Sequence, residues 1–230
     1  MNLSFDVISD LQLQSGDFDW EGKATSLYCV IPGNISDDMD VVKKTLLHLS
    51  TCYQGVFFID GSLEHDSVRD RDFRIKELTG ITKLAKNLVY LHDNVVVIDN
   101  VALIGANGWN GNYVPEDTTA EIDLVCAEYE DVSYLGNTID KLQELTDVTK
   151  IVIVTNSIPL SKLYYGDEPL RYSQVSLTDT LVRDTEHKVS HWIFGSTDRI
   201  IDIMDNDINY LNNPQYSRNP YYAKRIEVLY

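Results

Sequence analysis

Five polar turns in this sequence carry side chains that are capable of metal binding or proton transfer. Each turn follows a short apolar run, and together they supply mainly carboxylates, amides and hydroxyls. Oxygen atoms of these groups bind divalent cations, and the same groups also hydrogen-bond to one another. Functional groups of α/β proteins gather at the carboxyl ends of strands, so we expect the turns to meet at one sheet edge. They are Ser9–Leu13, Pro32–Asp37, Asp60–Asp66, Val154–Pro159 and Phe194–Asp198.

Short apolar, β-branched runs that end in polar or glycine residues predict the strands that position these turns. The last two internal runs are separated by Asp205–Asp207 and are expected to form a hairpin. The predicted strands are Leu3–Ile8, Ser26–Ile31, Gly55–Ile59, Leu88–Leu91, Val95–Ile98, Val101–Gly105, Lys150–Val154, His191–Phe194, Ile200–Met204, Ile208–Leu211 and Ile226–Tyr230.

Helical patterns fall between several of these strands. Asp37–Thr51 has apolar residues at helical spacing, early aspartates that suit the positive end of a helix dipole, and Ser36 as its expected cap. Asp70–Asn87, Thr118–Thr149 and Ser176–Val189 are the other predicted helices, the second interrupted near Val132–Gly136. Strands alternate with helices early and pair with each other late, which favours an α/β protein with layered sheets.

Composition excludes several classes of protein. The 230 residues contain 19 Lys and Arg against 36 Asp and Glu, a formal net charge of −17. Such a surface repels nucleic-acid phosphates and anionic lipid, so neither nucleic acid nor a membrane is the expected partner. No apolar run is long enough to span a bilayer, and the N-terminus lacks the pattern of a secretory signal. We therefore expect a soluble protein made in a cytoplasm.

Taken in order, the turns resemble the motifs of the calcineurin-like metallophosphoesterases. That family carries D-x-H, G-D-x-x-D, G-N-H-(D/E), T-H and G-H-x-H. The stretch Asn87–Trp109 is also similar to the strand, turn, strand and Gly-Ala-x-x-Trp segment of that family. The similarity extends over residues 3–216. The corresponding segments here are Asp10–Gln12, Gly33–Asp37, Gly61–Glu64, Thr155–Asn156 and Gly195–Asp198.

This resemblance implies a fold and a chemistry. The fold is α/β, a four-layer α/β/β/α sandwich of two mixed sheets flanked by helices, here as a single domain over residues 1–230. Active members of the family hold two metal ions, which bind a phosphate ester and activate a water for in-line attack. Two such ions clamp the attacking and leaving oxygens and need carboxylate and imidazole ligands to balance their charge.

Most of the family's metal-ligand positions are substituted in this sequence. Asp10 matches the aspartate ligand of the first metal and is retained. Gln12 takes the place of a histidine ligand, and Asn34 replaces the aspartate that would bridge both metals. A neutral amide at that position does not offset the repulsion between two neighbouring dications.

The remaining positions have also changed. Ser62 replaces an asparagine ligand of the second metal, and Leu63 replaces the histidine that protonates the leaving group. Asn156 and Ser196 replace two more histidine ligands, and Asp198 replaces the last one. An alkyl side chain cannot donate a proton, so the family reaction is not expected. The five histidines of the chain lie elsewhere: they are His48, His65, His92, His187 and His191.

Two interpretations of the substituted site stay open. Asp10, Asn34 and Asp198 are the candidates for holding a single Mg²⁺, Mn²⁺ or Ca²⁺ ion, since carboxylates and amides bind such ions weakly. The alternative, which we favour, is a hydrogen-bonded polar network that holds the turns together without any cofactor.

The sequence therefore predicts a catalytically inactive metallophosphoesterase-fold protein. Fold alone does not confer function, and we expect it to serve as a structural or protein-binding component of a larger assembly, such as a phage virion. Its partner would be another protein or further copies of the chain. Residues 214–230 combine aromatic and basic side chains in an acidic chain and suggest a docking tail. The candidate contact residues are Tyr216, Arg218, Tyr221, Tyr222 and Arg225.

Two other functions remain as alternatives. One is a divergent phosphodiesterase that uses one metal ion held by Asp10 and Asp198. The other is a module that binds a nucleotide or phosphorylated ligand without turnover, although the lack of cationic groups disfavours it.

Overall fold

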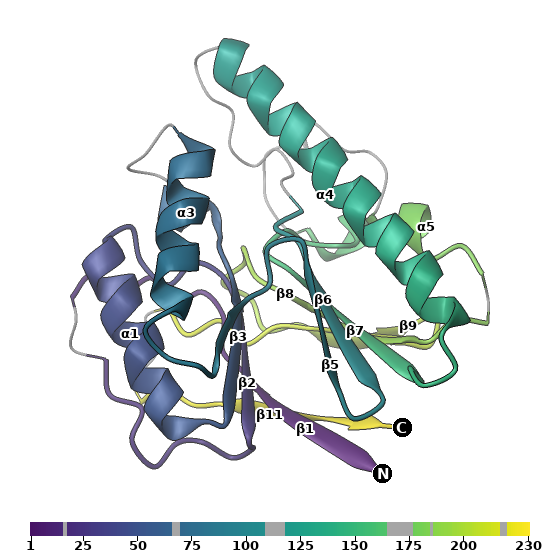
Figure 1. Ribbon diagram of the computed structural model, residues 1–230, viewed down its shortest axis with the longest axis horizontal. Coiled ribbons are helices and arrows are strands. Elements are labelled where there is room, and N and C mark those ends of the chain that lie inside the picture. Colours follow the sequence, from purple (N-terminus) through teal and green to yellow (C-terminus); the bar gives the residue numbers. More distant parts are fainter. Residues whose placement is uncertain (16–17, 66–69, 109–117, 165–176, 185, 217–219) are drawn as a thin grey trace.

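Two β-sheets lie at the centre of the molecule (Figure 1). The computed structural model describes residues 1–15, 18–65, 70–108, 118–164, 177–184, 186–216 and 220–230. One sheet has five strands in the order β11-β1-β2-β3-β4, of which β1 to β4 run parallel and β11 is antiparallel to β1. Its strands are β1 (Asn2–Val7), β2 (Tyr28–Pro32), β3 (Gly55–Ile59), β4 (Leu88–Tyr90) and β11 (Lys224–Leu229).

The second sheet has six strands in the order β5-β6-β7-β8-β10-β9. Strands β6, β7, β8 and β10 are parallel, whereas β5 and β9 join the two ends of the sheet as antiparallel strands. The strands are β5 (Asn94–Ile98), β6 (Val101–Gly105), β7 (Lys150–Thr155), β8 (Val189–Phe194), β9 (Asp202–Asp205) and β10 (Ile208–Leu211). The predicted hairpin is confirmed as β9–β10.

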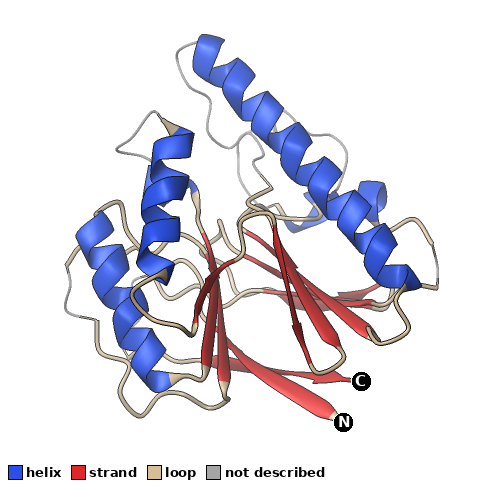
Figure 2. Ribbon diagram, viewed as in Figure 1, coloured by secondary structure: helices blue, strands red, loops and turns tan. Residues whose placement is uncertain are grey.

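Helices cover the outer face of each sheet (Figure 2). On the five-stranded sheet they are α1 (Met39–Cys52) and α3 (Arg71–Thr82), with the single turn α2 (Ser62–His65) at the end of β3. On the six-stranded sheet they are α4 (Thr118–Glu144) and α5 (Leu177–Leu181), and a 3₁₀ turn covers Ser161–Leu163. The predicted four-layer α/β/β/α sandwich of two mixed sheets is confirmed.

Apolar side chains fill the space between the sheets and beneath the helices. The central core contains Phe5, Val30 and Phe57 from one sheet, and it contains Leu103 and Ile193 from the other. Every predicted strand forms, with each boundary within two residues of its predicted position. Burial on both faces explains why the central strands, such as β3, β6 and β7, are recognisable as nearly continuous apolar runs.

The helix predictions need three corrections. Helix α4 is continuous through Val132–Gly136, where an interruption was expected. Gly136 is a site of close packing, because a Cβ atom there would lie 3.3 Å from Leu181 of α5. Helix α3 ends at Thr82 and not at Asn87, and among the described residues of the predicted helix Ser176–Val189, only Leu177–Leu181 are helical.

The predicted cap of the first helix is also wrong. Asp38 caps α1 by accepting a hydrogen bond from the backbone N–H of Asp40, while the Ser36 hydroxyl donates to the carbonyl of Leu13. Among the helices that the structure describes, none combines the length and apolar character required to cross a lipid bilayer.

Candidate functional site

The five polar turns meet where the parallel strands of both sheets end. Backbone hydrogen bonds join the first two turns, from Asp10 N–H to the Gly33 carbonyl at 3.3 Å and from Gln12 N–H to the Asn34 carbonyl at 3.0 Å. The last two turns are joined by a bond of 3.1 Å from Gly195 N–H to the Asn156 carbonyl. The expectation that the turns converge is therefore confirmed.

Four of the predicted site residues form one hydrogen-bonded group, which we call the amide cluster: Asp10, Asn34, Asn156 and Ser196. Asp10 Oδ1 accepts from Asn34 Nδ2 and from the backbone N–H of Ser196, both at 2.9 Å. The Ser196 hydroxyl donates to Asn156 Oδ1 at 2.7 Å, and Asn156 Nδ2 donates to the carbonyl of Pro32 at 2.8 Å. The group thus connects strand ends of both sheets.

Unusual backbone conformations bring these side chains together. Asp10, Asn34 and Ser196 have positive φ angles of 49°, 58° and 58°, a region that non-glycine residues seldom occupy. Gly61 has no side chain to clash with the cluster, whereas a Cβ atom there would lie 2.2 Å from Asn34 Oδ1. Glycine is therefore required at this close approach.

Asp10 is the ionisable member of the amide cluster, and it is almost fully buried. Burial raises its pKa to about 6, although hydrogen bonds from Asn34, Ser9 and the backbone near Ser196 oppose the shift. Its second oxygen, Oδ2, is buried without a hydrogen-bond partner. Asp10 therefore has one carboxylate oxygen left to accept a proton or a ligand.

The other predicted site residues lie around the amide cluster with weaker connections to it. The backbone N–H of Leu63 donates to Asn34 Oδ1 at 3.1 Å, so this position contributes its main chain. Gln12 is half-buried, and Ser62 is exposed at the start of α2. Asp198 is exposed, and in the described part of the chain no hydrogen bond connects it to Asp10.

Glu64 belongs to the site, although the sequence analysis gave it no role. It is 1% exposed and accepts backbone N–H bonds from Gly61 at 2.6 Å, from Asn34 at 3.0 Å and from Ile35. Burial raises its pKa to about 7, against the effect of these three bonds. Its place at the acidic end of the Gly61–Glu64 motif was the signal that could have identified it.

A second polar group lies beside the first, and we call it the carboxylate cluster: Asp60, His65, Tyr90 and Asp131. Asp60 Oδ2 and His65 Nε2 are 2.6 Å apart, and the Tyr90 hydroxyl donates to Asp60 Oδ1 at 2.7 Å. Burial favours a raised pKa for Asp60, but the hydrogen bond and charge of His65 outweigh it and hold that pKa below its usual value.

Asp131 joins the carboxylate cluster from helix α4. Its Oδ2 accepts the backbone N–H of Gly108 at 2.7 Å, and its Oδ1 is buried without a hydrogen-bond partner. Burial raises its pKa to about 7, and the charges of Asp93 and Asp60 add to the shift. Neither Asp131 nor Asp60 lies in one of the sequence motifs. Their contacts depend on how the layers of the fold pack, so the sequence did not identify them.

The metal-binding capacity of the described residues is limited. Within the described ranges, no group of three or more His, Cys, Asp or Glu side chains is placed to hold a metal ion. At Asp10, Oδ1 accepts two N–H donors, and among the described residues no hydrogen bond reaches the buried Oδ2. This atom is the one candidate ligand position that the amide cluster leaves open.

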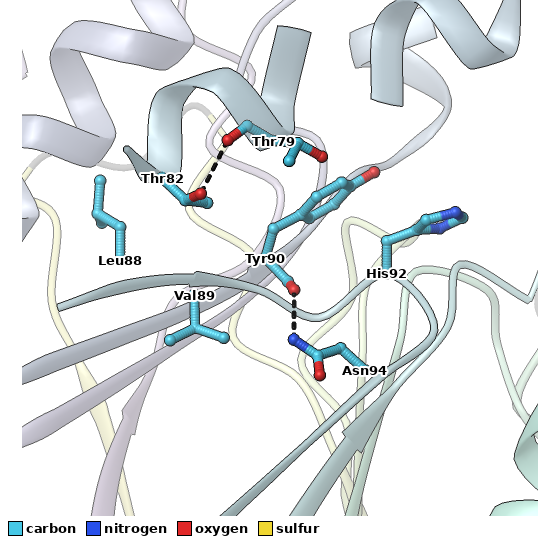
Figure 3. Close-up of a pocket in the computed structure, with 7 residues that line it drawn as sticks. All are labelled: Thr79, Thr82, Leu88, Val89, Tyr90, His92 and Asn94. Carbon is cyan, nitrogen blue, oxygen red and sulfur yellow. Dashed lines mark hydrogen bonds between the residues drawn. The ribbon is translucent and has the colours of Figure 1, made fainter. Parts of the chain in front are cut away.

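A small pocket lies beside the carboxylate cluster, between α3 and β4 (Figure 3). Its volume is about 300 Å³, and Tyr90 links it to the cluster by lining the pocket while its hydroxyl bonds Asp60. The His92 ring stacks on Tyr90 with centroids 5.5 Å apart. The lining residues are Thr79, Thr82, Leu88, Val89, Tyr90, His92 and Asn94.

Much of the predicted docking tail is part of the domain. Residues 224–229 form β11, and the Tyr221 ring lies 5.4 Å from that of Phe18. The Arg225 guanidinium donates to the carbonyl of Thr25 and pairs with Glu227. Tyr216 and Tyr222 are 50% and 41% exposed. Arg218 lies outside the described residues.

Comparison with known proteins supports the fold. No family model matches the sequence, and no curated protein matches it. The structure is similar to the phosphopantetheinyl hydrolase of Mycobacterium tuberculosis, with 14% identity, a TM-score of 0.64, and coverage of 98% of this chain and 96% of that one. It is also similar to a putative 5'-nucleotidase from Staphylococcus aureus, with 12% identity, a TM-score of 0.50, and coverage of 99% and 51%. The chain therefore has a metallophosphoesterase-type fold.

Proposed function

We propose that this protein is a catalytically inactive member of the metallophosphoesterase fold that acts by binding other proteins in a larger assembly. The observation that carries the proposal is the position of Asn34. Where active relatives would place a bridging aspartate, its amide donates to Asp10 Oδ1 and accepts from the backbone N–H of Leu63. The bridging position is thus occupied by a neutral, internally bonded side chain.

Electrostatics supports the loss of a two-metal site. Two neighbouring divalent cations need several anionic ligands, because their mutual repulsion is large at low dielectric. The amide cluster offers the single carboxylate of Asp10, whose Oδ1 already faces two N–H donors. A cation at that oxygen would also face the hydrogens of these donors, so the donor set does not fit a metal pair.

Proton transfer to a leaving group lacks a suitable residue as well. Leu63 has no ionisable group. The nearest imidazole, His65, is bonded to Asp60 at 2.6 Å in the carboxylate cluster. A general acid must lie within hydrogen-bond reach of the reacting group, and His65 is instead directed to a buried carboxylate.

A binding role accounts better for the surface. A net charge of −17 disfavours phosphorylated substrates and increases the rate of encounter with basic protein partners. Exposed Tyr216 and Tyr222 supply rigid aromatic contact area at the edge of the domain. A large protein assembly such as a phage virion offers this type of contact.

The test is turnover of bis-p-nitrophenyl phosphate by the purified full chain with Mn²⁺ added. The proposal predicts no hydrolysis above the rate of buffer with Mn²⁺. Hydrolysis that disappears in Asp10→Ala but persists in Asp140→Ala, a change at an exposed aspartate, would overturn it.

A second candidate is a divergent phosphodiesterase with one metal ion. The unpartnered Oδ2 of buried Asp10 favours it, as do the names of the two similar structures, a hydrolase and a putative nucleotidase. This candidate predicts the Mn²⁺-dependent activity that the first one excludes, so the same assay separates them.

A further inference from the structure

The edge strands of the six-stranded sheet differ in charge. At one end, β9 carries Asp202 and Asp205, which pair with Lys224 at 2.8 Å and with Lys162 at 2.6 Å. Charged side chains on an edge strand discourage pairing with another chain. At the other end, β5 (Asn94–Ile98) has no ionisable side chain. A strand without charged side chains contrasts with the rest of a chain whose net charge is −17.

The backbone of β5 has an alternating hydrogen-bond pattern. Residues Asp99 and Asn100 form a two-residue turn that joins paired Ile98 and Val101. The closing pair of such a hairpin exchanges hydrogen bonds, and the exchange then recurs at every second residue. The backbone groups of Ile98 and Val96 therefore point to β6, while those of Val95 and Val97 point to the open edge.

Side-chain exposure agrees with an available edge. Val97 is 50% exposed, whereas Val95, Val96 and Ile98 are half-buried. In the described part of the chain, β5 pairs with β6 along one side, and no strand pairs with β5 along its other side (Figure 1). An uncharged edge with β-branched residues is a template for further strand pairing.

We propose that β5 pairs with β5 of a second copy of this chain, antiparallel and about a two-fold axis at Val96. In that register Val95 of each copy lies opposite Val97 of the other, so the outward-facing N–H and C=O groups complement each other. The two six-stranded sheets become one continuous sheet across the dimer. This proposal goes beyond the proposed function and holds whether or not the protein has catalytic activity.

The two-fold register favours a second copy as the occupant of this edge, because it sets the outward-facing backbone groups of Val95 against those of Val97 in both directions. Two chains of equal negative charge repel each other, and the uncharged side chains of β5 limit that repulsion along the strand itself. A basic partner protein would gain more from the acidic surfaces than from β5. The proposed register also places Asp93 of one copy opposite Asp99 of the other at each end of the pair. Added salt should therefore tighten the dimer severalfold.

Sedimentation velocity of the full chain over a wide concentration range tests the proposal. Wild type is expected to change from monomer to dimer as its concentration rises, more readily in high salt. Val97→Lys should weaken the dimer by about a hundredfold, because a lysine on an edge strand discourages pairing with another chain. Val97→Pro should also weaken the dimer, because proline removes the backbone N–H of residue 97. That N–H faces the open edge, so its loss leaves the hydrogen bonds to β6 in place.

Two controls make the result specific to the β5 edge. Val97→Thr keeps a β-branched residue and should retain the dimer, and so should Met204→Lys on β9, where Met204 is 67% exposed. Melting curves establish that each variant is folded. A wild type that stays monomeric overturns the proposal, even if Val97→Lys abolishes binding of another protein. A dimer lost in Met204→Lys but kept in Val97→Lys overturns it as well.

Discussion

The amide cluster and the carboxylate cluster lie at the same sheet edge, and they bury polar groups in different ways. The amide cluster contains one ionisable residue, Asp10, and satisfies its neutral members through bonds to each other and to the backbone. The carboxylate cluster contains two buried aspartates, of which Asp60 lies 2.6 Å from His65, whereas Asp131 accepts the backbone N–H of Gly108.

This difference indicates which cluster has kept ionisable chemistry. Apart from Asp10, the amide cluster holds two amides and a hydroxyl, at Asn34, Asn156 and Ser196, and these groups need no counter-ion. The carboxylate cluster holds the Asp60–His65 contact and Asp131, a carboxyl group whose pKa is raised to about 7. Glu64 lies between the clusters: it accepts N–H bonds beside Asn34, and the charge of Asp60 contributes to its raised pKa.

The largest effect is expected from Glu64→Ala. The change leaves three buried backbone N–H groups without their acceptor, at Gly61, Asn34 and Ile35. Each unsatisfied donor costs about 1–3 kcal/mol, so we expect a loss of about 4 kcal/mol in the free energy of unfolding. Urea denaturation measures it. Glu144→Ala, at an exposed position of α4, is the control and should change stability little; equal losses would contradict the assigned role.

Asn34→Asp should have the next largest effect. It replaces the donor at Asp10 Oδ1 with a second carboxylate, so that two like charges meet in a buried site. We expect a loss of about 3 kcal/mol at pH 8, and a smaller loss at pH 5, where the pair can hold a proton. Chemical denaturation at both pH values gives the comparison. Asn137→Asp, exposed on α4, should show neither effect; a pH-independent loss in Asn34→Asp would argue against charge repulsion.

Asp131→Asn should stabilise the protein at high pH. Burial raises the pKa of Asp131 from 3.8 to about 7, so the folded state favours the protonated form. This contribution to stability is fully present below pH 3.8 and is lost as the pH rises through about 7. An asparagine stays neutral, so the variant should be more stable than wild type by about 2 kcal/mol at pH 8.

At pH 5 this advantage should be smaller, and below pH 3.8 it should disappear, because Asp131 is then protonated in the folded and the unfolded state alike. Melting temperatures across the pH range provide the measurement. Asp140→Asn, an exposed change on the same helix, serves as the matched control. A constant difference between Asp131→Asn and wild type at all pH values would exclude titration of Asp131 as the cause.

The smallest effects come from removing one hydroxyl in each cluster. Tyr90→Phe deletes a bond to the ionised Asp60 carboxylate and should cost about 2 kcal/mol. Ser196→Ala deletes a bond to the neutral Asn156 amide and should cost about 1 kcal/mol. The order of the two losses, measured by urea denaturation, is the test. If Ser196→Ala cost more, the description of the amide cluster as the less charged region would fail.

The sequence predicted the strands well because most are short apolar runs bounded by polar residues, and the central ones, such as β3 and β6, are buried along their whole length. The turn motifs also identified Asp10, Asn34, Asn156 and Ser196, since strand order alone brings these turns to one edge. Helix ends were predicted less well. At Gly136 the close approach of Leu181 favours a glycine within a continuous helix, and a sequence pattern cannot distinguish this from an interruption.

The carboxylate cluster could not be predicted from the sequence. Asp131 lies on α4 and meets Asp60 only because α4 packs beside the end of β6, which is a property of the assembled layers. The sequence around His65 did not indicate that Asp60, five residues earlier, would be its partner. Asp198 illustrates the opposite error: it occupies a motif position, but it is exposed to solvent.

The central proposal is that a hydrogen-bonded cluster with a single carboxylate, Asp10, stands where the family resemblance implies a two-metal site. Thermal unfolding of wild type with and without millimolar Mn²⁺ tests it most directly, because a ligand that binds the folded state raises Tm even without turnover. We predict the same Tm under both conditions, in wild type and in Asp10→Ala. A Tm that rises with Mn²⁺ in wild type and not in Asp10→Ala would contradict the claim.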